Sequence, residues 1–321
     1  MLRIPIEQVT ETLTRALCRL EFEPDRAALG ARLFAETTRD GVYSHGLNRF
    51  PRFVATIRNG CVDPRGRPEC IAAQGVLERW HGHAGPGNLN AVQAMDRAIA
   101  LAREHGVGAV AMAHTTHWMR GGSYGWQAAE AGMIGICWTN TMPNLPPWGS
   151  SEARLGNNPM VIAVPRAAGH VVLDMAMSQF SYGALASYRQ RGELLPVDGG
   201  FDTEGRLTRD PAEIEKSWRP LPIGYWKGSG LSLVLDMMAA MLSGGRATHQ
   251  VPADPLREAG VCQVFVAFDP SINDGAADMA DRIVASLGVR YPGQQVLRIR
   301  AENLALGLPV DPALWDELQT I

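Results

Sequence analysis

Residues 41–50 read GVYSHGLNRF and follow a segment with helical periodicity. Asp40-Gly41 is a turn signal, and the small residues beyond it leave the ring of His45 clear of a packed core. An imidazole with an unperturbed pKa of about 6.5 can exchange a proton near neutral pH. Arg49 lies four residues later, and its planar guanidinium can bind a carboxylate. The pattern suits reduction of a 2-oxo acid, although a helix start whose histidine only bonds the backbone has the same local sequence.

The spacing of apolar residues around this stretch predicts a small helical module, with helices at 6–19, 24–38 and 47–58. From about residue 70, β-rich runs alternate with helices, but without the regular spacing of a βαβ ladder. Strands are predicted at 76–80, 107–113, 133–139, 160–164, 171–175 and 261–268, and helices at 90–104, 123–131, 181–191, 231–242, 276–287 and 296–304. The segment 192–230 is predicted to be one long loop, which at that length is usually functional.

We therefore expect an α/β protein of the mixed α+β type, with a mixed sheet flanked by helices. The chain of 321 residues is long enough for a sizeable core and two domains. The expected division is a helical module at 1–70 that carries His45, joined by C-terminal helices at 274–321, and a mixed-sheet domain at 71–273.

The composition is that of an ordinary globular protein, with 46% hydrophobic residues, 20% charged residues and a net charge of −3. No basic stripe predicts nucleic-acid binding, and no polybasic or long apolar run predicts a membrane association. The first 20 residues predict an amphipathic helix and not a signal peptide. The five cysteines are scattered without a CxxC pair, which favours a reducing cytoplasm.

Familiar cofactor and nucleophile motifs are missing. GPGNLN (85–90) comes nearest to a dinucleotide fingerprint, but Asn90 replaces its third glycine and no acidic residue follows at the required distance. His114 and His117 have a spacing seen in metal sites, yet no acidic residue stands close, so no metal is predicted. No GxSxG or SxxK motif is present.

Six stretches together resemble the type II malate/L-lactate dehydrogenase family. They are GVYSHGLNRFPRF (41–53), HWMRGGSYGWQAAE (117–130), IGICWTN (134–140), PPWG (146–149), LPVDGGFD (195–202) and GYWKGSG (224–230). Within that family the likeness is greatest to the 2,3-diketo-L-gulonate reductases. The stretches are long and cover most of the chain, so coincidence does not explain them.

The resemblance implies a non-Rossmann NAD(P)-binding domain on the mixed sheet, completed across a homodimer, with NADH as cofactor and NADPH not excluded. Three segments should contact the cofactor, and their residues are His170, Val171, Val172, Leu173, Asp174, Met175, Ala176, Trp226, Lys227, Gly293, Gln294 and Gln295. Without the resemblance, 170–176 would be interpreted as a core strand, Trp226 as a loop residue and 293–295 as the start of a helix. Relatives tend to carry a histidine and an acidic residue where this chain has its two glutamines. Without an acidic side chain near the adenosine ribose, a 2′-phosphate would not be repelled.

By the same resemblance, His45 donates a proton, Arg49 anchors a carboxylate, and His117 helps to polarise the substrate carbonyl. Ser44, Arg120 and Asn140 are further candidates for substrate contacts, and Asn140 also ends a predicted strand. The expected protein is a cytoplasmic NAD(P)H-dependent reductase of a small 2-oxo or diketo sugar acid. Two alternatives stay open. One is a dehydrogenase that oxidises malate, L-lactate or ureidoglycolate, and the other is a non-catalytic sugar-acid binding protein.

Overall fold

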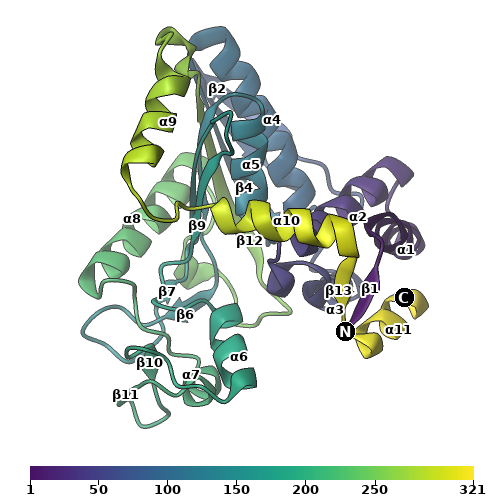
Figure 1. The fold of residues 1–321 in the computed structure, drawn as a ribbon, viewed down its shortest axis with the longest axis vertical. Helices are drawn as coiled ribbons and strands as arrows, with labels where there is room; N and C mark the ends of the chain where they lie inside the picture. Colours follow the sequence, from purple (N-terminus) through teal and green to yellow (C-terminus); the bar gives the residue numbers. More distant parts are fainter.

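A mixed seven-stranded sheet lies at the centre of the computed structural model, which describes all residues from Met1 to Ile321 (Figure 1). The strand order is β2-β3-β4-β12-β5-β8-β9. Only β3 and β4 pair in parallel. The strands are β2 (Glu69–Gln74), β3 (Leu77–His81), β4 (Val107–Thr116), β5 (Ile134–Thr139), β8 (Met160–Val164), β9 (Val171–Met175) and β12 (Ala259–Phe268). The predicted mixed α/β fold is confirmed.

Helices pack on both faces of this sheet. They are α4 (Gly87–His105) and α5 (Gly122–Glu130) on one face and α8 (Trp226–Ser243) on the other. Strand β4 shows why both faces are covered: Val110 and Met112 join the core under α4 and α5, whereas Ala111 and Ala113 join the core under α8. Helix α4 also makes the crossover that the parallel pair β3 and β4 requires. No helix combines the length and apolarity that a membrane crossing demands.

The two ends of the chain meet in a separate helical module (Figure 1). Its elements are β1 (Leu2–Ile4), α1 (Ile6–Arg19), α2 (Pro24–Arg39), α3 (Phe50–Arg58), β13 (Leu308–Val310) and α11 (Pro312–Thr320). Strands β1 and β13 pair antiparallel, and α11 packs on α1. Phe34, Phe50 and Phe53 form the aromatic centre of this core, and burial of each side chain contributes about 1.5–3 kcal/mol.

The other two C-terminal helices lie apart from each other. Helix α10 (Gln294–Leu306) runs from the sheet towards the module, whereas α9 (Ala276–Ser286) lies at the opposite end of the molecule (Figure 1). The contribution of 274–321 to the module therefore comes from α10, β13 and α11. The division of the chain into domains stays a prediction.

The segment 192–230 is not one long loop, which corrects the sequence-based expectation. It follows α6 (Tyr182–Arg191) and contains β10 (Gly200–Phe201), β11 (Leu207–Thr208) and α7 (Pro211–Ser217). A small core of Leu185, Leu195 and Ile214 holds it together. Helix α8 begins at Trp226, five residues before the expected start. Gly228 allows this, since a Cβ atom there would lie 2.4 Å from the carbonyl oxygen of Ile223.

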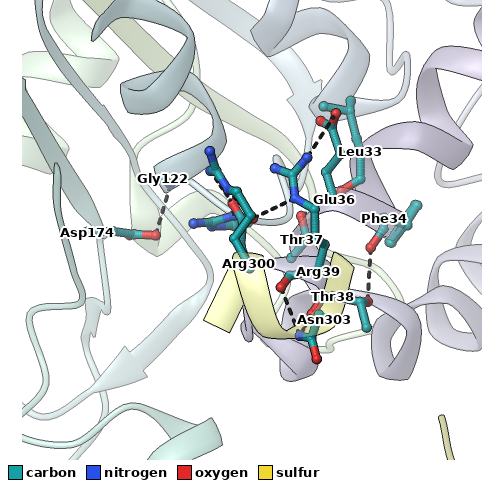
Figure 2. Close-up of polar contacts among 12 residues, drawn as sticks. Leu33, Phe34, Glu36, Thr37, Thr38, Arg39, Gly122, Asp174, Arg300 and Asn303 are labelled. Carbon is teal, nitrogen blue, oxygen red and sulfur yellow. Dashed lines mark hydrogen bonds and ion pairs between the residues drawn. The ribbon is translucent and has the colours of Figure 1, made fainter. Parts of the chain in front are cut away.

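A buried carboxylate, Asp40, joins the module to the sheet. Its side chain is 2% exposed and accepts hydrogen bonds from Arg39, Arg120 and Arg300, at 2.8, 2.7 and 2.8 Å. Arg39 from the end of α2 and Arg300 from α10 lie side by side (Figure 2). Arg120 comes from the connection between β4 and α5. Burial alone would raise the pKa of Asp40, but the three arginines lower it to about 2.

We expect Asp40→Asn to lower the free energy of unfolding by about 3–5 kcal/mol, because the buried guanidinium of Arg120 would lose its counter-charge. Urea denaturation measures this loss, and Asp316→Asn on the exposed face of α11 is the control. The lowered pKa also means that the Asp40 contribution is complete above pH about 4 and disappears as the pH falls towards 2. A variant as stable as the parent protein at pH 7 would contradict the role of Asp40.

Candidate active site

A cleft of about 890 Å³ opens between the helical module, the sheet and the segment around α6 and α7. The module contributes His45, Arg49 and Arg52, the connection after β4 contributes His117, and strand β9 contributes Asp174. Volumes of this size are typical of sites for small molecules and cofactors. The three catalytic residues predicted from the sequence therefore line one cavity, although 72 positions separate His45 from His117.

The turn that carries His45 is fixed by a close approach to α2. The backbone N–H of Leu47 donates to the hydroxyl of Thr38 at 2.9 Å, and that hydroxyl donates to the carbonyl of Phe34. Gly46 fits here because a Cβ atom would lie 2.1 Å from the same hydroxyl oxygen. Short 3₁₀ turns at 43–45 and 47–49 then place His45 and Arg49 on the cleft wall.

The rings of His45 and His117 are stacked, with their centroids 6.0 Å apart and their planes 16° from parallel. Nδ1 of His117 accepts a hydrogen bond from the backbone N–H of Met119 at 2.9 Å. In the neutral ring the proton is therefore on Nε2, so that nitrogen can donate. Nδ1 of His45 lies 3.1 Å from the hydroxyl of Ser44, which is within hydrogen-bond distance.

The cleft is cationic, and this sets the charge of both histidines. Loss of hydration, followed by the positive charges of Arg49, Arg120 and Arg52, lowers the pKa of His45 to about 3. Loss of hydration and Arg49 likewise lower the pKa of His117 well below its usual value. Both rings are therefore neutral at pH 7 when no anion is bound.

One hydrogen-bond donor of Arg49 has no acceptor. Its Nε is buried and contacts no acceptor, which costs about 1–3 kcal/mol for a buried donor. Burial and the charge of Arg52 lower the pKa of Arg49 to about 10, yet it stays cationic at neutral pH. Arg52 itself binds the carbonyl of Pro255 through Nε and Nη2. The sequence analysis missed Arg52, although its spacing of three from Arg49 on a helix was a usable signal.

Strand β9 forms the opposite wall. Val172, Leu173, Asp174 and Ala176 line the cleft, and Gly293 adjoins them from the start of α10. The carboxylate of Asp174 accepts a hydrogen bond from the backbone N–H of Gly122 at 2.9 Å (Figure 2). Carboxylates of this kind bind ribose hydroxyls in nucleotide sites. The unpartnered Nε of Arg49 and the glycine-lined wall thus fit a dinucleotide and an anionic substrate, and their roles stay predictions.

Several predicted cofactor residues lie outside this cleft. They are His170, Val171, Met175, Trp226, Lys227, Gln294 and Gln295. The ring of His170 accepts from the backbone of Arg166, and the two glutamines line a separate pocket. Trp226 and Lys227 begin α8, and the Trp226 side chain is exposed. The contact of these residues with a cofactor stays a prediction.

The expectation that Asn140 lines the cleft is corrected by its hydrogen bonds. Its Nδ2 donates to Asp236 and to the carbonyl of Arg246, and its Oδ1 accepts from the backbone of Cys262. Asn140 therefore joins the end of β5 to its neighbours, and it is not among the residues that line the cleft. Arg120 does line the cleft, but its Nη1 is bound to Asp40. Ser44 also lines it.

The segment around α6 and α7 supplies a wall that the sequence did not reveal. Tyr182 and Trp218 are in contact, with ring centroids 5.0 Å apart, and both line the cleft. The hydroxyl of Tyr182 is buried without a hydrogen-bond partner. Arg189 and Glu215 form an ion pair at the same wall. No local motif marks these residues, because they meet only after α6 and α7 pack together. No group of three or more His, Cys, Asp or Glu side chains is arranged to hold a metal ion.

The family model for malate/L-lactate dehydrogenase matches residues 4–319. The 2,3-diketo-L-gulonate reductase of Citrobacter koseri is 46% identical over the full length of both chains. The chain belongs to the malate/L-lactate dehydrogenase family. It is an oxidoreductase, and the resemblance seen in the sequence is confirmed.

Solved structures of malate/L-lactate dehydrogenase type share the whole fold. Sulfolactate dehydrogenase from Methanocaldococcus jannaschii has a TM-score of 0.90 at 26% identity, covering 99% of this chain and 96% of that one. Delta1-piperideine-2-carboxylate reductase from Pseudomonas syringae has a TM-score of 0.90 at 25% identity, covering 100% and 99%. The names of these family members point to different substrates, so the fold alone does not select one.

The charge of this dehydrogenase cleft predicts that an anion controls the protonation of His45. Because Arg49 and Arg52 disfavour the imidazolium, oxamate bound between them should raise the pKa of His45 from about 3 towards its usual range. NMR titration of the histidine ring protons measures the change, and His45→Gln assigns the signal. A His45 ring that titrates near pH 6.5 in the free protein would contradict the electrostatics described above.

Proposed function

We propose that the protein is an NAD(P)H-dependent reductase of a 2-oxo or diketo sugar acid, with 2,3-diketo-L-gulonate as the preferred substrate and 3-keto-L-gulonate as the product. The observation that carries this proposal is the meeting of His45, His117 and Arg49 in one cleft beside β9. A curated relative with this activity is 46% identical over its whole length.

The walls of the cleft support a substrate with both a carboxylate and a hydroxylated chain. Arg49 offers a buried donor without a partner, which suits a carboxylate. The buried hydroxyl of Tyr182 also lacks a partner, and a sugar hydroxyl could satisfy it. Pyruvate has a carboxylate for Arg49 but no hydroxyl group for Tyr182. A site whose buried polar groups are left unpaired discriminates strongly against the shorter substrate.

The nicotinamide cofactor, when bound, supplies the hydride that reduces the carbonyl. Val172, Leu173, Asp174 and Gly293 would hold it along the cleft wall. The N–H at Nε2 of His117 donates to the carbonyl oxygen and polarises it. The substrate carboxylate offsets the charge of Arg49. This raises the pKa of His45, so that the ring can be protonated before the hydride is transferred. His45 then gives its proton to the forming alkoxide.

A homodimer is part of this proposal. Helix α8 carries a row of exposed apolar side chains: Leu231, Leu233, Val234, Met237, Met238 and Met241. Monomeric proteins rarely expose so much contiguous apolar surface on one helix. Pairing through this face would cover it and would also bury the exposed Trp226 at its start. We place the enzyme in the cytoplasm, where its five free cysteines would remain reduced.

Loss of absorbance at 340 nm tests the substrate. We expect fast oxidation of reduced cofactor with 2,3-diketo-L-gulonate and slow oxidation with pyruvate or oxaloacetate, because only the diketo acid has both a carboxylate for Arg49 and hydroxyl groups for Tyr182. Oxidation of malate, L-lactate or ureidoglycolate with NAD⁺ is assayed in parallel. Equal rates with the simple oxo acids would reject the sugar-acid assignment, and cofactor binding without any turnover would favour a binding protein.

His45→Ala should lower kcat by about 10²–10⁴-fold, the usual value of general acid catalysis, while the Kd of the cofactor stays nearly constant. Arg49→Gln should instead raise the KM of the substrate by about 10–100-fold, since it removes about 1.5–3 kcal/mol of charge-assisted hydrogen bonding. His105→Ala on α4 and Arg58→Gln on α3 are exposed controls outside the cleft. An unchanged kcat in His45→Ala would disprove its role, and loss of cofactor binding in Arg49→Gln would disprove the role of Arg49.

A further inference from the structure

A second pocket of about 740 Å³ lies beside the start of α10, and we call it the arginine pocket. It is lined by Arg166, Arg290 and Arg298, together with Tyr291, Gln294 and Gln295. None of its 10 lining residues is acidic. Arg290 and Arg298 have no counter-charge within the chain, and like charges around one cavity repel each other unless an anion occupies it, so the lining favours an anion site.

The side chain of Arg166 provides a second observation that indicates a bound ligand. Its side chain is only 8% exposed, and its Nη1 is buried without a hydrogen-bond partner. Nε pairs with Asp281, and the guanidinium lies over the ring of Tyr291, 4.8 Å from its centroid. These two contacts fix the orientation of the guanidinium. A buried N–H group held in this way is ready for an acceptor that the chain itself does not supply.

Arg290 and Arg298 complete the pocket as exposed side chains that form no ion pair or hydrogen bond within the chain. Arg290 precedes α10, and Arg298 lies in its second turn, next to Gln294 and Gln295. The only acidic group bonded to an arginine of this pocket is Asp281. Two exposed cations and one buried, oriented cation are therefore available to an incoming anion.

The arginine pocket adjoins the active-site cleft. Gly293 lines the cleft, and the next residue, Gln294, lines the arginine pocket. The segment is held against the cofactor wall, because the N–H of Val172 donates to the carbonyl of Pro292 at 3.0 Å. A ligand that extends along β9 past Gly293 would therefore bring its far end to the arginines.

We propose that the arginine pocket binds a phosphate monoester, the 2′-phosphate of NADPH, and that this enzyme prefers NADPH to NADH. The inference depends on the proposed function, since it assigns one end of the same cofactor. Arginine forks match phosphate oxygens in geometry and charge. The neutral Gln294 and Gln295 permit the phosphate to approach, whereas a carboxylate at either position would repel it.

The test compares the binding of NADPH and NADH to the full chain by isothermal titration calorimetry. Two or three charge-assisted hydrogen bonds should make the Kd of NADPH at least about tenfold lower than that of NADH. The double variant Arg290→Gln/Arg298→Gln should bring the two Kd values within about threefold and leave that of NADH unchanged. Arg282→Gln removes the same charge from the exposed face of α9, outside the pocket, and should preserve the preference.

Smaller ligands separate the possible sources of the phosphate. We expect 2′-AMP to bind more tightly than 5′-AMP, and inorganic phosphate to compete with NADPH but not with NADH. Phosphate that binds without displacing NADPH would overturn the assignment to the cofactor. Equal Kd values for the two dinucleotides in the parent protein would overturn it as well, and the proposed function would stand if NADH still supported reduction. If neither dinucleotide bound, the proposed function would fail with it.

Discussion

The buried carboxylate of Asp40 fixes the walls of the cleft relative to each other. It lies five residues before His45, and it binds Arg120, which lies three residues after His117. It also binds Arg300, on the helix that begins directly after Gly293. One charged group therefore connects the segments that carry His45, His117 and the cleft wall at Gly293. Three arginines share its charge, so the cost of its burial is met by several hydrogen bonds together.

One of these arginines, Arg120, also acts on His45. Loss of hydration, followed by the positive charges of Arg49, Arg120 and Arg52, lowers the pKa of His45 and keeps the ring neutral in the absence of an anion. A fixed carboxylate beside His45 would hold the ring protonated at all times, but it would also compete with the substrate for Arg49. In the proposed mechanism the substrate supplies that counter-charge. Protonation of His45 would thereby be coupled to binding of the molecule that receives the proton.

The sequence predicted several elements in which burial is one-sided or continuous. Helices α1 and α2 have clear apolar stripes, and β4 is apolar on both faces, so their periodicity was sufficient. Strand β2 was missed because all six of its residues are exposed and show no alternation. Helix α7 had a usable signal, since Asp210 caps it and Pro211 takes its first position. The start of α8 did not, because Gly228 is typical of a loop until the approach of Ile223 is known.

Some features of the candidate site depend on residues close in sequence, whereas others arise only when distant segments pack together. His45 and Arg49 share one turn, so the sequence could relate them to each other. Asn140 shows the limit of such reasoning: the end of β5 was located correctly, but the direction of its amide depends on Asp236 and Cys262, which are distant in sequence. The arginine pocket shows this limit of sequence-based prediction most clearly. At Gln294 and Gln295 the sequence reveals only that no acidic group is present. The structure brings three arginines together there, one from the turn between β8 and β9 and one from each side of the start of α10. The absence of an acidic side chain only permits a 2′-phosphate to approach. The oriented guanidinium of Arg166, whose Nη1 lacks a hydrogen-bond acceptor, would attract it.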